Sequence, residues 1–537
     1  MPEYIDPFIP DEPPESTGLP ADHPPWTNLA ENEDIVKNAL KFSQKKFEQY
    51  KSDRSPYDST ESATPGKWVE ADYMFNCGLD TTRREAKQKK DTLSDTGSAA
   101  FFRQVVTIAA QLITVYNHRR ELGKYTPIQS SSVWLDTEDA DHQAKQHTAI
   151  FHKALADAEF DLKFTNFAWL LGRYGNHPMM ASWLYRTKKF PDRVKTTNKS
   201  GQIEYKHVER EKIEANRPDW QFVPIESVYA DVHIGTMEKQ QCIIITSEDE
   251  ISNLYGLQRD GQITNVDKIN KTQMYSGADD NSMHQERQAS RGGESGNDTE
   301  TGLIKRKDVL LKIPVGLKKG KTGEKASDYE WDEKKHEPKL YWMLVTGELG
   351  GSIEGDNPNA TCLVLRENPD SRRKCPIKMI HLFPGNDDEL YHISPAEISA
   401  PDYDQIVTEK NMANDDVILQ HERPLLVAYG ETFSKDLSYG ASKIIMVANT
   451  QTSIREMDVK TNIGDTLGMI NYSEGAMDRA LATNEVIAGE FSSGRHSASE
   501  SVNVYSQAQK PHNLIASYVL RQVIPEMAEY AKTGYHI

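Results

Sequence analysis

The residues that come nearest to a nucleotide site are Gly316-Leu-Lys-Lys-Gly320-Lys321-Thr322. A phosphate-binding P-loop needs one more residue between its glycines, so that enough backbone N–H groups converge on the phosphate. The sequence after Thr322 also lacks the amphipathic helix whose N-terminus would face the phosphates. The stretch is therefore predicted to be a basic loop.

Three histidines have the residue type of a metal site but not its spacing. His142, His147 and His152 recur every five residues, which turns each about 140° away from the previous one on a helix. Ligand pairs on one helix face need separations of about three or four residues. No metal is expected at these histidines.

A group of carboxylates resembles paired acids or a metal cage, and its members are Asp402, Asp404, Glu409, Asp415 and Asp416. No glycine-centred calcium loop and no histidine at ligand spacing accompanies them. They are predicted to form the solvated acidic face of a helix. No catalytic residue, metal or cofactor is therefore expected, and we expect a protein that is not an enzyme.

The acidity is concentrated in one part of the chain. Residues 396–490 hold 7 Lys and Arg against 16 Asp and Glu, a net charge of −9, while the whole chain of 537 residues carries −18. If this stretch lines a pore, the pore repels phosphate.

Length and composition limit the class of protein. A chain of 537 residues is long enough for several domains. A pI near 5.4 argues against a protein that grips nucleic acid over its whole surface. The 4 cysteines form no CxxC pair, no signal peptide is recognisable, and no apolar run reaches membrane-span length. We expect a protein made in a reducing cytoplasm, with no membrane segment.

Hydrophobic periodicity predicts a mixed α+β body. Residues 1–30 form a Pro-rich arm that cannot propagate a helix. It is either a disordered tail or a segment laid along a neighbouring subunit or partner. Apolar residues at helical spacing predict a core helix over 102–116 and another from Phe151 through Leu162 to Trp169. Residues 257–306 lose periodicity and are predicted to be a mobile surface insertion. Strands are predicted within the ranges 222–246, 340–346, 361–366 and 376–383.

Two long helices flanking a short β segment follow this body. The first is predicted to begin after Ser399-Ala-Pro401 and to end near Arg423-Pro424. Two short strands, 425–429 and 443–447, precede a second helix over about 452–488. The first helix carries a thin apolar stripe that is predicted to pack on identical neighbouring chains, formed by Tyr403, Ile406, Val407, Ala413 and Val417.

Three short motifs occur in the order found in one family. Arg495-His-Ser-Ala-Ser-Glu500 resembles the Arg-x-Thr-Ala-Thr-Glu signature of portal proteins of short-tailed phages. Lys51-Ser-Asp-Arg-Ser-Pro-Tyr57 resembles the family's Arg-x-Pro-Tyr stretch. Pro376-Ile-Lys-Met-Ile-His-Leu382 resembles the strand that leads into its first stem helix. Serines at 497 and 499 replace the usual threonines and keep the hydroxyls.

The resemblance implies the portal fold and its division of the chain. The expected parts are a wing, two stem helices, a clip, a tunnel loop and a long wing helix with a short or absent crown. Their ranges would be 31–395 for the wing, 396–421 and 452–488 for the stem helices, 422–451 for the clip, 489–500 for the tunnel loop, and 501–537 for the wing helix and tail. Pro511 would kink the wing helix.

The resemblance also implies roles for individual residues. The tunnel loop would place Phe491, Ser493, Gly494, Arg495, His496 and Ser497 at the DNA channel. Acidic residues of the stem would line the channel, namely Asp402, Glu409, Asp415 and Asp416. The clip would present Arg423, Tyr429, Lys435 and Lys443.

Portals form homo-oligomeric rings, typically dodecamers, at one vertex of the capsid, and they are assembled in the host cytoplasm. Double-stranded DNA passes through the ring during packaging and ejection. The resemblance therefore implies as partners the terminase large subunit, tail adaptor and tail proteins, and the major capsid and scaffolding proteins.

Two alternatives of other classes stay open. Another structural protein of the capsid or tail would explain the acidity and the Pro-rich arm, but not the order of helix, strands, helix and loop. A nucleotide-dependent DNA-processing enzyme would need the Gly316–Thr322 stretch to bind phosphate. Rings with a central hole would favour the portal, and monomers with ATPase activity would favour the enzyme.

Overall fold

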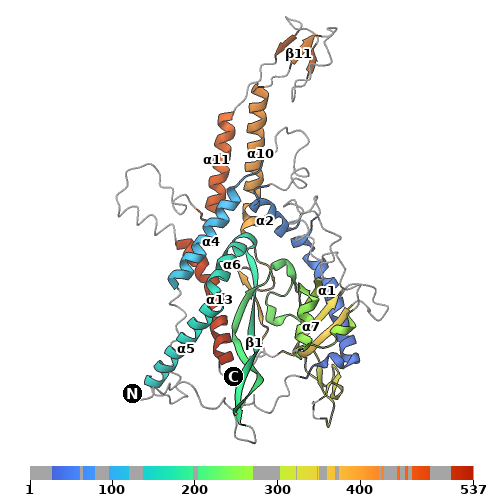
Figure 1. The fold of residues 1–537 in the computed structure, drawn as a ribbon. Helices are drawn as coiled ribbons and strands as arrows, with labels where there is room; N and C mark the ends of the chain where they lie inside the picture. The colour runs from blue at the N-terminus through green and yellow to red at the C-terminus, as the bar shows by residue number, and fades with distance from the viewer. Residues whose placement is uncertain are drawn as a thin grey trace.

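The chain forms an elongated molecule in which a body of helices and sheets carries a two-helix projection (Figure 1). The predicted mixture of helices and strands is confirmed. The computed structural model describes residues 27–60, 65–78, 96–119, 137–197, 203–259, 261–269, 303–321, 323, 325–347, 349, 360–368, 374–421, 425–428, 444–447, 454–456, 463–483 and 510–535. The Pro-rich arm, 1–30, lies outside this range except for its last residues.

Most of the described helices lie before residue 175 or after residue 394, and most of the described strands lie between these two positions. The described α-helices are α1 (Glu33–Asp58), α2 (Lys67–Phe75), α4 (Ala100–Arg119), α5 (Thr137–Asp157), α6 (Phe160–Tyr174), α7 (Ile251–Arg259), α10 (Pro395–His421), α11 (Ile463–Ala480) and α13 (Lys510–Tyr535). The described strands are β1 (Asn176–Thr197), β2 (Ile203–Phe222), β3 (Val228–Tyr229), β4 (Cys242–Glu250), β5 (Leu303–Ile313), β6 (Val315–Leu317), β7 (Tyr329–Trp331), β8 (Lys339–Gly347), β9 (Ala360–Glu367), β10 (Ile377–His381), β11 (Leu425–Ala428), β12 (Ile444–Val447) and β13 (Ile454–Glu456).

The predicted helix over 102–116 is confirmed as α4, whose face with Val105 and Leu112 is buried. The predicted stretch from Phe151 to Trp169 is instead two helices, α5 and α6. Glu159 between them has a left-handed φ of 52°, which ends the first helix and changes the helical register. Leu162, predicted to be in the core, is consequently 62% exposed, and the phenylalanines of α6 are buried in its place.

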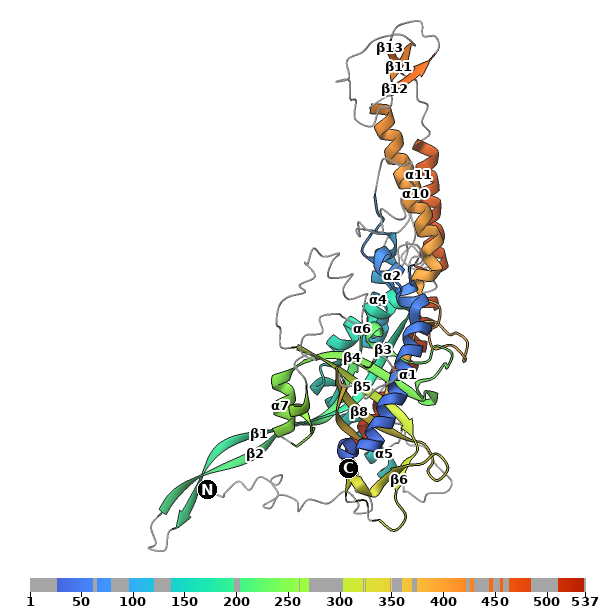
Figure 2. The same ribbon diagram turned by 90° about the vertical axis from the view of Figure 1, so that its right-hand side faces the viewer.

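A long antiparallel ribbon, not predicted from the sequence, is formed by β1 and β2. The two strands pair from Met179↔Phe222 to Thr197↔Ile203, and the ribbon reaches away from the body (Figure 2). Lys and Glu are frequent in this ribbon, although both residue types are depleted from strands in general. The apolar periodicity that identifies most strands is therefore missing. At the body end β10 pairs with β1 from Asn176↔His381 to Met180↔Ile377.

The centre of the body is a sheet whose described strands have the order β3-β4-β5-β8-β9. Side chains alternate between its two faces, as the pleat of a strand requires. Met343 and Val345 of β8 belong to the same core as Phe47 and Tyr50 of α1. Leu344 belongs to the core on the opposite face, with Leu254 of α7. The strands predicted at 340–346, 361–366 and 376–383 are confirmed as β8, β9 and β10.

The prediction of a mobile insertion over 257–306 is wrong at both of its ends. Ile263 and Val266 are 3% and 1% exposed and pack in the core beneath α7. Residues 303–306 begin β5, which pairs with β4 and β8. The apolar residues at these two ends are few and stand among many polar residues. Their periodicity is therefore too weak to predict a helix or a strand. Residues 270–302 lie outside the described range.

The stretch that resembled a P-loop belongs to a β-hairpin. Gly316 lies in β6, which pairs with β7 from Val315↔Trp331 to Leu317↔Tyr329. A Cβ at Gly316 would lie 2.4 Å from the His336 ring, so glycine is needed there for packing. Lys318 donates its backbone N–H to Asp328 O at 2.7 Å across the hairpin. The described residues between β6 and β7 include a short 3-10 helix, Ala326–Asp328, and none of them forms the α-helix that would face a phosphate.

Candidate functional site

The candidate site is the two-helix projection, which we call the stem. α10 leaves the body, α11 returns to it, and the sheet β12-β11-β13 lies beyond their far ends (Figure 1). The strands predicted at 425–429 and 443–447 are confirmed as β11 and β12, which pair in parallel from Leu425↔Ile444 to Ala428↔Val447. The second helix was predicted over 452–488, but α11 spans Ile463–Ala480 and residues 454–456 form β13.

The start of α10 is fixed by a reciprocal capping box. Ser394 Oγ accepts from the Glu397 backbone N–H, and Glu397 Oε1 accepts from the Ser394 backbone N–H, both at 3.1 Å. Pro395 takes the first helical position, where it loses no hydrogen bond. The prediction that Pro401 occupies the first turn is therefore wrong, since Pro401 lies inside the helix.

A buried amide joins this helix start to the body. Asn176, at the first residue of β1, is 1% exposed. Its Oδ1 accepts from the His392 backbone N–H at 2.9 Å and from His381 Nδ1 at 2.8 Å. Its Nδ2 donates to His392 O at 2.7 Å. Gly175 before it has a φ of 71°, and a Cβ there would lie 2.7 Å from Ser394 Cα, so only glycine fits.

Gln104 of α4 ties both stem helices to the body. It is 1% exposed; its Oε1 accepts from Ser399 Oγ of α10 at 2.9 Å, and its Nε2 donates to Asp478 Oδ1 of α11 at 3.4 Å. Burial raises the pKa of Asp478, and the hydrogen bonds from Gln104 and Thr483 oppose that rise. The start of α10 and the end of α11 are thus held at the same height along the axis of the stem.

The segment before α4 continues along α10. Thr96 donates its backbone N–H and its hydroxyl to Asn411 Oδ1, both at 2.8 Å. Lys410 Nζ donates to Ser98 Oγ at 3.1 Å and lies 3.9 Å from Glu474 of α11. One side of the stem is therefore covered by the body, which we call its body side.

An apolar seam holds the two helices together. Tyr403 and Ile406 of α10 are fully buried, in the same core as Ile470 and Met477 of α11. The ring of Tyr73 meets Tyr403 edge-on at a centroid distance of 6.4 Å. The stripe predicted to pack on identical neighbours is therefore covered by the chain's own α11 and α2 at these two positions. Val407 and Ala413 are half-buried and buried, and Val417 alone of the stripe is exposed, at 39%.

Asp402, Glu409 and Asp416 recur every seven residues of α10 and therefore share one side of the helix. We call them the inner stripe. It lies about a quarter turn from the seam, on the side away from Asn411. All three are half-buried. Asp415, grouped with them in the sequence, lies about 100° to 140° around the helix from the members of the stripe.

The remaining predicted site residues lie outside the described range. These are Arg423, Tyr429, Lys435 and Lys443 of the clip region and Phe491, Ser493, Gly494, Arg495, His496 and Ser497 of the predicted tunnel loop. The part of the predicted wing helix that the structure describes is α13, from Lys510 to Tyr535. The kink was predicted at Pro511, and the residues that precede Lys510 lie outside the described range.

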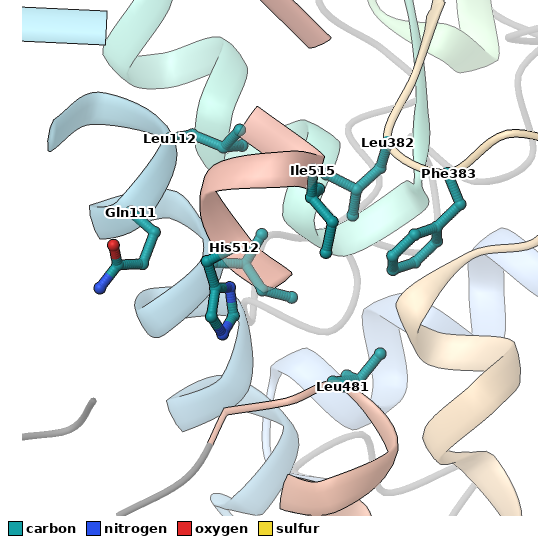
Figure 3. A pocket seen from close by; sticks show the side chains of 8 residues that line it. Gln111, Leu112, Leu382, Phe383, Leu481, His512 and Ile515 are labelled. Atoms are coloured by element: carbon teal, nitrogen blue, oxygen red, sulfur yellow. The ribbon is translucent and has the colours of Figure 1, made fainter. Parts of the chain in front are cut away.

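A small pocket marks the joint between stem and body (Figure 3). Leu481 after α11, Leu112 of α4 and Ile515 of α13 line it. His512 of α13 lies beside it, with Nε2 2.8 Å from Ala482 O, and burial lowers its pKa. We interpret the pocket as a packing gap beneath the end of α11.

Arg54 shows what the Arg-Ser-Pro-Tyr stretch does in this fold. It is 2% exposed and pairs with Asp58 at 2.7 Å. Its Nη1 donates to Glu226 O and Val228 O at 2.8 and 3.0 Å, and its guanidinium lies 3.7 Å from the Tyr229 ring centroid. The stretch thus connects α1 to the start of the central sheet.

His142, His147 and His152 all lie on α5. Among the residues that the structure describes, no group of three His, Cys, Asp or Glu side chains is arranged to hold a metal ion. None of the described helices is both long and apolar enough to cross a membrane.

No protein-family model matches the sequence, and no curated protein matches it.

Proposed function

We propose that this chain is the subunit of a portal ring, through which double-stranded DNA enters and leaves a capsid. The observation that carries the proposal is the construction of the stem: two helices adjacent in sequence leave and re-enter an α/β body, with a small sheet at their far end. The order of elements is the order that the motif resemblance implies.

The charge of the stem supports the same function. α10 holds six acidic residues and one lysine, and its inner stripe is a line of carboxylates along the helix. Duplex DNA carries one negative charge per roughly 1.7 Å of axis, and charges interact over about 8 Å at physiological salt. A ring of inner stripes would repel the phosphates and keep a sliding duplex from adhering to the wall.

The motif resemblance supplies the proposed division into parts. The body is the wing, α10 and α11 are the stem, residues 422–451 are the clip and 489–500 the tunnel loop. We propose the clip as the docking surface for the terminase large subunit and later for tail adaptor proteins. Capsid and scaffolding proteins would surround the wing, at one vertex of the virion. The portal would guide DNA without catalysis, because packaging motors supply the ATP hydrolysis.

Negative-stain imaging of the purified full chain, together with sedimentation velocity, tests the proposal. We expect closed rings with a central hole, typically of twelve copies, and a single large sedimenting species. A protein that stays monomeric over a wide concentration range, or that forms open filaments, would contradict it. Rings that hydrolyse ATP on their own would point to the enzyme class instead.

A further inference from the structure

Each stem helix has an exposed face about half a turn from the apolar seam. On α11 this face is formed by Gly468, Tyr472, the half-buried Gly475 and Arg479. On α10 it is formed by Thr408 and Met412, with the exposed Asp404 at its edge toward the body side, seven residues before Asn411. We call them the lateral faces. Tyr472 is 65% exposed and Met412 50% exposed. One exposed apolar residue on each face is ordinary for a protein surface, so the charge and shape of the faces carry the assignment.

The lateral faces lie at opposite edges of the stem. The seam occupies the space between the helices, and the body side and the inner stripe occupy the two remaining sides. In a ring of stems packed edge to edge, the lateral face of α11 would meet the lateral face of α10 on the next copy. This geometry makes the interface heterologous, which is the type that closes into rings.

The two faces are complementary in charge. Arg479 is exposed, and its guanidinium lies 5.9 Å from the Tyr472 ring centroid, so it reaches back toward the start of α11. Gln104 holds Asp478 level with Ser399. α10 and α11 run antiparallel and rise by the same distance per residue, about 1.5 Å. Counted along the stem axis from the level of Ser399, the guanidinium therefore lies at about the height of Asp404, which is exposed on α10.

The faces are also complementary in shape. A Cβ at Gly468 would meet nothing within 4 Å in the chain, so this glycine is not required by packing within one copy. Glycine inside an exposed helix costs about 1 kcal/mol relative to alanine. A helix from a second copy that approaches closely at Gly468 would account for it. Thr408 lies at the same height on the opposite lateral face, by the same level argument.

We infer that the lateral face of α11 packs against the lateral face of α10 on a second copy of this chain, with Arg479 paired to that copy's Asp404 and Gly468 close to its Thr408. The inference rests on the proposed ring, because rotation about a common axis keeps every stem at one height. It assigns the inner stripe to the channel and Asp404 to the joint between copies.

Cysteine cross-linking tests the interface directly. Thr408→Cys and Gly468→Cys are introduced together in a chain with Cys77→Ser and Cys375→Ser, leaving the two fully buried native cysteines. Within one copy the pair is separated by both helices, far beyond the roughly 7 Å between Cα atoms that a disulfide spans. Oxidation is expected to give a ladder of covalent oligomers on a non-reducing gel. Each single-cysteine variant should give dimers at most.

A control pair and a charge swap refine the test. Asp402→Cys with Ala476→Cys places both cysteines on the inner side and should give no ladder. Arg479→Glu should lower the yield of the ladder by about tenfold, as expected for loss of an interfacial charge pair, and Asp404→Lys in the same chain should restore it. An unchanged yield in Arg479→Glu would overturn the assigned ion pair.

Cross-linking and imaging together separate the two proposals. A ladder with closed rings supports both. A ladder from filaments supports the lateral contact and contradicts the portal ring. Rings without a ladder support the portal and overturn the lateral contact. Neither ladder nor rings overturns both.

Discussion

The imidazole rings of His381 and His392 stack with their centroids 3.7 Å apart and 19° between their planes. Both rings lie beside Asn176, where the stem joins the body. Burial, and then repulsion from His392, lowers the pKa of His381 to about 3. The histidine is therefore neutral in the folded chain near neutral pH.

Acid should destabilise the fold through this pair. An unfolded histidine has a pKa of about 6.5, so between pH 6.5 and 3 the unfolded chain binds more protons than the folded one. The stabilisation is complete above about pH 6.5 and is lost as the pH falls. At pH 5 the loss from His381 alone should be on the order of 2 kcal/mol. Urea denaturation at pH 7.5 and 5.0 measures it, and His381→Gln should shrink the difference; an unchanged difference would show that another group is responsible.

Replacing Gln104 should loosen the stem base. Gln104→Ala removes the partner of the Ser399 hydroxyl at a buried position. It also removes one of the two donors to Asp478 Oδ1, which keeps its hydrogen bond from Thr483. Each buried polar group left without its partner costs about 1–3 kcal/mol. The free energy of unfolding should fall accordingly, while Thr114→Ala, at an exposed position of the same helix, should change it little. Equal effects of the two variants would contradict the bridging role.

Arg54 should be intolerant of substitution. Arg54→Met leaves two buried backbone carbonyls and Asp58 without their donor, which should cost about 3–5 kcal/mol. Arg54→Lys should recover only part of it, because lysine cannot reproduce the planar fork over Tyr229. Lys51→Ala, at an exposed position of α1, is the matched control. Thermal denaturation of the three variants tests this order.

Reversing the inner stripe should make the channel adhere to DNA. Asp402→Lys, Glu409→Lys and Asp416→Lys together should leave ring formation intact and create salt-dependent retention of duplex DNA. The control carries the same charge change at exposed body positions, Glu248→Lys, Glu333→Lys and Glu337→Lys. Filter binding at several salt concentrations compares them. Equal retention by both variants would argue that the stripe does not face the DNA path.

Deleting Phe491–His496 should leave ring assembly unchanged and reduce the passage or retention of packaged DNA. Half of the stretch is serine or glycine, and Phe491 is its one apolar residue, so we expect its removal to leave the fold intact. Imaging and a packaging assay provide the two readouts. Loss of folding or of oligomers would place the segment in a structural role.

Local patterns and long-range contacts differ in how far the sequence predicts them. α4, β8, β9 and β10 were predicted because their apolar residues recur at helix or strand spacing. The start of α10 was misplaced because Pro401 was preferred to the capping box Ser394-Pro-Ala-Glu397, a local signal that was present in the sequence. β13 was missed because it depends on pairing with β11, about thirty residues earlier.

The residues that hold the candidate site were mostly invisible to sequence patterns. Gln104 and Ser399 are 295 positions apart, and nothing local to either residue indicates the contact. The acidity of the stem was predicted from composition, but its division into an inner stripe and a lateral face required the positions of the seam and of the body side. Periodicity identifies a helix without telling which side meets which neighbour.

The packing of the stem decreases toward its far end, since none of the described residues after Ala413 in α10 or before Ile470 in α11 is buried. That half of the stem has little to stabilise it in an isolated chain. Under the proposed packing, its order and the association of copies are thermodynamically linked, so that mass action governs both. The apparent melting temperature of the stem should then rise with protein concentration, whereas that of the body should not.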